Sequence, residues 1–147
     1  MRKGILVALF AIIVLVGGVL IIGCDPITRQ CFGAQNMTNI VLTEHASPAD
    51  FKMALASGEY KLLDIRTEEE FSAGHINNSE QIDFYKTEEF LGFLDSLDKN
   101  QKYLIYCRTG NRSAKALEIM KQKGFKSVSD LDGGISAWVS GGYLVEK

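Results

Sequence analysis

The sequence predicts an α/β fold, with a parallel sheet that has helices on both faces and is preceded by an N-terminal hydrophobic segment. Between residues 39 and 147, short apolar stretches typical of strands alternate with stretches whose apolar residues recur at helical spacing. Capping residues, glycines and prolines separate them at short intervals. Such alternation is typical of a parallel sheet covered on both sides. We expect a hydrophobic segment 1–23, a tether 24–38 and one domain, 39–147.

The domain should begin with an edge strand and a helix. Residues 39–43 have the composition of an edge strand. The next helix should run from residue 48 to about residue 57, because Ser47 is a good N-cap and Pro48 suits the first helical position. Gly58 should end it.

A buried strand and a short helix should follow. Residues 61–65 predict the strand. Thr67 and Glu70 have the spacing of a capping box, which starts a short helix that ends at Gly74. Residues 81–84 predict a weak strand.

The second half of the domain repeats the alternation. Residues 87–97 predict an amphipathic helix. Its core side chains should be Phe90, Phe93, Leu94 and Leu97.

Two further strands, 102–106 and 127–131, should flank a helix that runs from residue 111 to about residue 123. Residues 132–134 then turn the chain toward Trp138, which we expect in the core.

The loop between the strand 102–106 and the following helix carries the chemistry. Cys107 stands at the end of the strand, where loop N–H groups and the positive end of the helix favour a thiolate and bind anions. Arg108 and Arg112 add positive charge, and Gly110 permits a close backbone approach. Tyrosine phosphatases place an arginine six positions after the cysteine. Here the arginine comes after five, so the loop is better suited to holding a small group on the sulfur itself.

The segment 106–113, with the sequence Tyr-Cys-Arg-Thr-Gly-Asn-Arg-Ser, resembles the active-site loop of rhodanese (sulfurtransferase) domains. Three other segments are similar to signatures of that family and occur in the right order: 63–66, 70–76 and 131–138. The resemblance covers the chain from about residue 38 to its end and implies the rhodanese fold. It also implies structural roles for His75 and for Asp64 and Arg66, which would hold neighbouring loops together. His45 lies in a polar segment, and we expect it to be solvated.

The resemblance implies a sulfurtransferase in which Cys107 is catalytic and carries the transferred sulfur as a persulfide. The residues that would bind the substrate are Arg108, Thr109, Gly110, Asn111 and Arg112. The partners would be a small anionic sulfur donor, such as thiosulfate, and an acceptor that is cyanide, a small thiol or a protein thiol. The alternative is a non-catalytic sulfur-carrier or thiol-sensing module that docks on a membrane partner. A phosphatase or arsenate reductase is disfavoured by the short loop.

The N-terminal segment predicts attachment to a membrane. The apolar run from Gly4 to Gly23 is 20 residues long and follows Arg2 and Lys3. This length is close to that of a transmembrane helix, but the run ends at Cys24 in a sequence similar to a lipobox, in which that cysteine would be acylated. Both alternatives stay open, and both place the domain on the extracytoplasmic side.

The remaining composition excludes other classes of function. Beyond residue 23 the net charge is about −4, because Arg2 and Lys3 are removed from a total of −2. No basic patch with interleaved aromatic residues indicates nucleic acid. A Cys24–Cys31 disulfide would exclude lipidation, and either way Cys107 should stay free. The cysteines and histidines lack zinc-ligand spacing, so we expect no metal and no cofactor.

Overall fold

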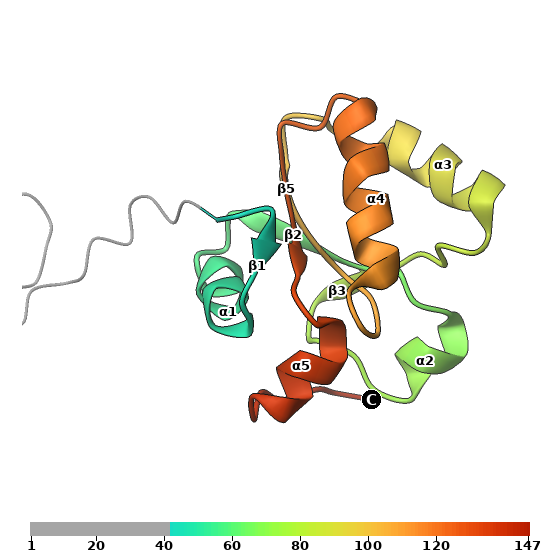
Figure 1. The fold of residues 1–147 in the computed structure, drawn as a ribbon. Helices are drawn as coiled ribbons and strands as arrows, with labels where there is room; N and C mark the ends of the chain where they lie inside the picture. The colour runs from blue at the N-terminus through green and yellow to red at the C-terminus, as the bar shows by residue number, and fades with distance from the viewer. Residues whose placement is uncertain (1–41) are drawn as a thin grey trace, which may run out of the picture. The chain divides into compact units, whose positions relative to one another are not determined.

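The computed structural model describes residues 42–147. This part of the chain contains a five-stranded sheet with the strand order β1-β5-β4-β2-β3 (Figure 1). Every pairing between neighbouring strands is parallel. The strands are β1 (His45–Ala46), β2 (Tyr60–Asp64), β3 (Ser79–Gln81), β4 (Lys102–Tyr106) and β5 (Ser127–Leu131). The predicted parallel α/β fold is therefore confirmed.

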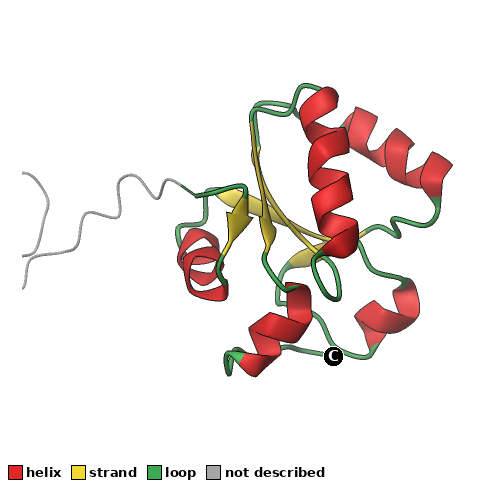
Figure 2. Ribbon diagram, in the orientation of Figure 1, coloured by secondary structure: helices red, strands yellow, loops and turns green. Residues whose placement is uncertain are grey.

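Within residues 42–147, five helices connect and cover the strands (Figure 2). They are α1 (Pro48–Ala56), α2 (Glu68–Ser72), α3 (Thr87–Ser96), α4 (Asn111–Gln122) and α5 (Gly134–Ser140). In Figure 1, α1 and α5 lie on one side of the sheet, and α3 and α4 lie on the other. The sheet is thus covered on both faces, as the sequence predicts.

Each face of the sheet has its own core. Side chains from α3 and α4 pack on one face around Tyr103, Ile105 and Cys107 of the β4 segment. Side chains from α1 and α5 pack on the other face around Leu104 and Tyr106. This alternation follows from the pleat of a strand, which turns successive side chains to opposite faces. It turns the Cys107 side chain toward α3 and α4.

Local capping explains where the first two helices begin. The Ser47 hydroxyl accepts a hydrogen bond from the backbone N–H of Asp50, at 3.3 Å, and Pro48 is the first residue of α1. Thr67 and Glu70 form both hydrogen bonds of a capping box at the start of α2. Such caps satisfy the N–H groups that the first turn of a helix leaves without partners.

Two predicted strands are placed differently in the structure. The edge strand β1 is at His45–Ala46, because it pairs with Asp130 and Leu131 of β5, whereas Leu42 and Thr43 lie outside any strand. Residues 39–41 of that prediction lie outside the described residues. The strand β3 spans Ser79–Gln81 rather than 81–84, and Ile82 and Phe84 beyond it pack against the core.

The remaining core predictions are confirmed in large part. Phe90 and Leu94 of α3 are buried, while Phe93 and Leu97 are partly buried against the same core. Trp138 is buried on the opposite face of the sheet.

The hydrophobic segment, the tether and Cys24 all precede the described residues, so these predictions are not tested. Within residues 42–147, no helix has the length and apolar character needed to cross a bilayer.

Candidate active site

Cys107 directly follows β4 and lies at the carboxyl edge of the sheet, four positions before α4 begins at Asn111. Only 1% of its surface is exposed, and it is a free cysteine. The turn between them ends at Gly110, which caps α4 with a positive φ of 93°. A side chain is strained in that conformation, which explains the glycine.

The turn and the first residues of α4 direct hydrogen-bond donors at the sulfur. The backbone N–H of Gly110 donates to Sγ at 3.2 Å, and the Ser113 hydroxyl lies 3.6 Å from Sγ. Burial raises the pKa of the Cys107 thiol, but donors outweigh it and lower the pKa below its ordinary value. These donors are the N–H and hydroxyl of Ser113 and the N–H groups of Thr109 and Arg112. The site therefore favours a thiolate.

The start of α5 fixes the loop from behind. The N–H of Ile135 donates to the carbonyl of Cys107 at 2.9 Å, and the N–H of Ser136 donates to the carbonyl of Arg108 at 3.1 Å. Gly134 lies so close that a Cβ atom there would be 2.5 Å from the Cys107 carbonyl oxygen. The sequence predicts the turn at 132–134, but its packing against the cysteine loop comes from the structure.

The two arginines of the loop have different surroundings. The guanidinium of Arg112 donates two hydrogen bonds to the Glu70 carboxylate, at 2.7 and 2.8 Å, and its side chain is only 12% exposed. The Arg108 side chain is 70% exposed, and its Nε lies 3.9 Å from Glu70. Thr109 and Asn111 are exposed beside them. All five predicted binding residues lie in the turn after Cys107 and at the start of α4, but Arg112 already has an anionic partner within the chain.

Asp64 and Arg66 form a buried ion pair behind the site. Arg66 donates to both Asp64 carboxylate oxygens, at 2.6 to 2.9 Å, and also to the backbone carbonyls of Glu70 and Gly74. The pair joins the end of β2 to α2, which carries Glu70. This arrangement agrees with the loop-holding role expected for these two residues.

A line of polar contacts on the β5 side of the site was not predicted. The Ser113 hydroxyl lies 3.1 Å from one Asp130 carboxylate oxygen, and the other oxygen lies 2.6 Å from Nδ1 of His45. His45 is exposed as expected, with 58% of its side chain accessible, but its ring also contacts the buried Asp130 carboxylate. The sequence signal was an acidic residue, Asp130, within the last predicted strand.

His75 lies in a structural setting. Its ring stacks on Phe71 with centroids 3.8 Å apart, and its Nδ1 lies 3.2 Å from the Phe71 carbonyl oxygen. Its backbone pairs with Glu146 through two hydrogen bonds, which tie the C-terminal segment to the end of α2. These contacts agree with the expected structural role.

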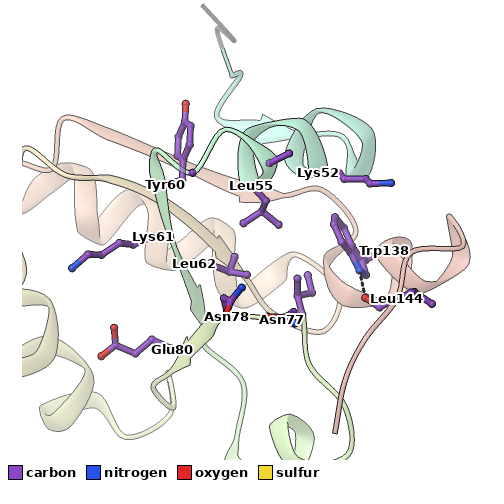
Figure 3. Close-up of a pocket in the computed structure, with 13 residues that line it drawn as sticks. Lys52, Leu55, Tyr60, Lys61, Leu62, Asn77, Asn78, Glu80, Trp138 and Leu144 are labelled. Carbon is purple, nitrogen blue, oxygen red and sulfur yellow. Dashed lines mark hydrogen bonds between the residues drawn. The ribbon is translucent and has the colours of Figure 1, made fainter. Parts of the chain in front are cut away.

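A cavity of about 620 Å³ lies on the opposite face of the sheet (Figure 3). Lys52 and Leu55 of α1, Leu62 of β2 and Trp138 of α5 contribute to its wall, and the Trp138 indole donates to the Leu144 carbonyl at 3.0 Å. Residues 107–113 do not line it. Cys107 and this cavity are therefore separate features of the described part of the chain.

Comparison with known proteins gives one family. Residues 47–141 match the family described as Rhodanese-like domain, and this range includes β2 to β5 and the cysteine loop. A rhodanese-related protein from Thermoplasma volcanium superposes with a TM-score of 0.62 at 33% identity, covering 71% of this chain and 98% of that one.

Two curated relatives are larger than the matched region. The chain is 33% identical over 97 residues to the protein HIGH ARSENIC CONTENT 1 of Arabidopsis thaliana, covering 60% of this chain and 57% of the relative. It is 28% identical over 127 residues to an adenylyltransferase and sulfurtransferase of Zea mays, covering 74% of this chain and 27% of the relative. Further relatives are tRNA uridine(34) hydroxylases, of which the chain spans about 30%.

Proposed function

We propose that this protein, which belongs to the rhodanese-like domain family, is a sulfurtransferase that carries a sulfane sulfur as a persulfide on Cys107. One observation carries the proposal: the Cys107 sulfur is buried among hydrogen-bond donors at the start of α4, which lower its pKa. An inert core cysteine would have no such surroundings, because apolar burial alone raises the pKa of a thiol.

In the first step the Cys107 thiolate attacks the outer sulfur of an anionic donor such as thiosulfate. A bond forms between Sγ and this sulfur, the S–S bond of thiosulfate breaks, and its electron pair leaves with sulfite. The product is a persulfide anion on Cys107, so the total charge is conserved. The donors that stabilise the thiolate are also placed to stabilise the persulfide.

In the second step a thiophilic acceptor attacks the outer persulfide sulfur. With cyanide the products are thiocyanate and the free Cys107 thiolate, so the enzyme returns to its starting state. A small thiol or a protein thiol would accept the sulfur in the same manner. The exposed guanidinium of Arg108 is available to attract an anionic donor or acceptor, while Arg112 would have to loosen its pair with Glu70 to do so.

Mass spectrometry after incubation with thiosulfate tests the proposal. We expect one added sulfur on the tryptic peptide 103–108, which contains Cys107 and neither of the other two cysteines. Cyanide should remove that sulfur and release thiocyanate. The Cys107→Ser variant should take up no sulfur on this peptide and should lack steady turnover. Failure of every sulfane donor to load the wild-type peptide would overturn the proposal.

The pair between Arg112 and Glu70 favours a second candidate, a non-catalytic sulfur carrier or thiol sensor. An arginine that already binds a carboxylate assists an incoming anion less than a free one. Such a module would load Cys107 stoichiometrically but would turn over slowly with thiosulfate and cyanide. Steady-state turnover measured beside the loading experiment separates the two candidates.

We also propose that residues 1–23 attach the domain to a membrane with the domain on the extracytoplasmic side. Support comes from the uncharged apolar run of 20 residues behind two basic residues. Metabolic labelling with a fatty acid distinguishes the two forms of attachment. If the protein is a lipoprotein, the wild type should carry the label and Cys24→Ala should not. If the segment is a spanning helix, neither the wild type nor the variant should carry the label. Recovery of the unlabelled full chain in the soluble fraction would contradict both.

A further inference from the structure

A continuous line of contacts joins the Cys107 sulfur to a histidine at the protein surface. It runs from Sγ to the Ser113 hydroxyl (3.6 Å), then to Asp130 (3.1 Å), and then to Nδ1 of His45 (2.6 Å). The Asp130 side chain is 2% exposed, whereas that of His45 is 58% exposed. A buried carboxylate thus lies between the nucleophile and the solvent-exposed ring.

The strand order produces this line of contacts. In the parallel pairing of β1 with β5, His45 stands opposite Asp130, so their side chains extend from the same face of the sheet. The adjacent Leu131 packs on the α1 and α5 side, so Asp130 points the other way, toward the first turn of α4 and Ser113. These three residues come from three separate elements.

The Ser113 hydroxyl has one proton and three acceptors within reach. These are the Cys107 sulfur, an Asp130 carboxylate oxygen and the Gly110 carbonyl oxygen, at 3.6, 3.1 and 3.0 Å. A hydroxyl that donates to an ionised Asp130 cannot donate to the sulfur at the same time. The charge on Asp130 therefore determines how often the Ser113 hydroxyl donates its hydrogen bond to the thiolate.

We propose that His45 and Asp130 form a positioning pair that controls, through the Ser113 hydroxyl, how strongly the Cys107 thiolate is stabilised. With Asp130 ionised, its carboxylate competes for the hydroxyl. With Asp130 protonated, the carboxyl donates to the serine oxygen, and the serine proton turns to the sulfur. His45 sets this balance because its ring binds the same carboxylate. The proposal deepens the proposed function, since it concerns the reactivity of the same nucleophile.

Burial supports a titratable role for Asp130. Burial raises the pKa of the Asp130 carboxyl above its ordinary value, although hydrogen bonds from His45 and Ser113 act in the opposite direction. Further charged groups lie around the line of contacts. Glu44 is beside His45 and pairs with Lys121 at 2.9 Å. Asp132 is near Asp130, and Arg112 is near Cys107. Asp132 opposes ionisation of Asp130, and Arg112 favours the thiolate.

Alkylation of Cys107 across a pH series tests the pair directly. The rate follows the thiolate fraction, and iodoacetamide labelling of peptide 103–108 in the full chain reports Cys107 alone. We expect Asp130→Asn to lower the midpoint by about one pH unit, because it removes a nearby like charge and leaves a neutral, weaker acceptor for the hydroxyl. Ser113→Ala should raise the midpoint. In the Ser113→Ala background, Asp130→Asn should have less than half of its effect, since the connecting hydroxyl is missing.

A titration of the unaltered chain requires no substitution at a buried position. Groups that interact report each other's ionisation, so the NMR signals of the His45 ring should show an inflection at the alkylation midpoint of Cys107. That inflection should be absent in Cys107→Ser. His75 is the internal control, because its carboxylate partner is Glu146, 3.6 Å away. Its signals should show no inflection at the Cys107 midpoint.

Two results together would overturn the proposal: no inflection of the His45 signals at the Cys107 midpoint, and an alkylation midpoint that Asp130→Asn leaves unchanged. Neither measurement depends on sulfur transfer. The positioning pair can therefore fail while persulfide formation stands, and persulfide formation can fail while the titrations remain coupled.

Discussion

Glu70 and Arg112 are 42 residues apart in the sequence and are joined by two hydrogen bonds, 2.7 and 2.8 Å long. Glu70 also accepts a hydrogen bond from the backbone N–H of Thr67, at 3.1 Å, so one carboxylate caps α2 and neutralises the arginine of the cysteine loop. This pair sets the charge at the mouth of the site, and two predictions follow from it.

Glu70→Gln should strengthen binding of the anionic donor. The amide can still cap α2, but it no longer neutralises Arg112, so the guanidinium can bind the donor. We expect the KM for thiosulfate to fall several-fold, with a steeper dependence on salt. Glu68→Gln in the same helix makes the same change of charge at an exposed position and is the matched control. An equal effect in both variants would mean that only net charge matters.

Thermal unfolding at different pH values tests the same pair through stability. Hydrogen bonds from Arg112 lower the pKa of Glu70 below its ordinary value of 4.5, although partial burial opposes them. The folded chain therefore holds the proton less tightly than the unfolded chain. The pair stabilises the fold above pH 4.5, and this contribution is lost as the pH falls through the lower folded value. The Tm of the wild type should exceed that of Glu70→Gln at pH 7, and the two should converge in acid. A constant difference would contradict the prediction.

Removing one member of the buried pair between Asp64 and Arg66 should lower the free energy of unfolding much more than breaking a surface pair. Asp64→Ala leaves a guanidinium that is 4% exposed without its anion, and we expect a loss of about 3–5 kcal/mol in the free energy of unfolding. Glu59→Ala, which breaks an exposed pair with Lys102 at 2.6 Å, should cost less than about 1 kcal/mol. Urea unfolding of both variants measures the difference, and equal losses would show that burial is not the cause.

Gly134→Ala should distort the cysteine loop. Its φ is +59°, and an added Cβ would lie 2.5 Å from the Cys107 carbonyl oxygen and 2.6 Å from the carbonyl carbon of Arg108. We expect persulfide formation to be lost. Gly142→Ala is the control, because its φ is +80° but no atom lies within 4 Å of the added Cβ. Gly142→Ala should lower the free energy of unfolding by about 1–2 kcal/mol through backbone strain alone. This variant should still form the persulfide. Normal loading in Gly134→Ala would contradict the role given to this contact.

The sequence by itself determined the class of fold, the helix starts at Ser47 and Thr67, the strands 102–106 and 127–131, and the cysteine loop between strand and helix. These features depend on residues that are neighbours in the chain, so periodicity, caps and glycines are sufficient to predict them. The short strands β1 and β3 were misplaced by about two residues or more, because pairing with β5 and β2, rather than composition, fixes where they lie.

Only the tertiary structure decided which charges and backbone groups surround Cys107. It placed Glu70 on Arg112, Gly134 behind Cys107, and His45 on Asp130, which is 85 residues away in the sequence. The physical reason is that these contacts depend on the order and register of the strands. Strand order brings distant segments to one edge of the sheet, and a pattern within a single segment carries no information about which distant segment will lie beside it.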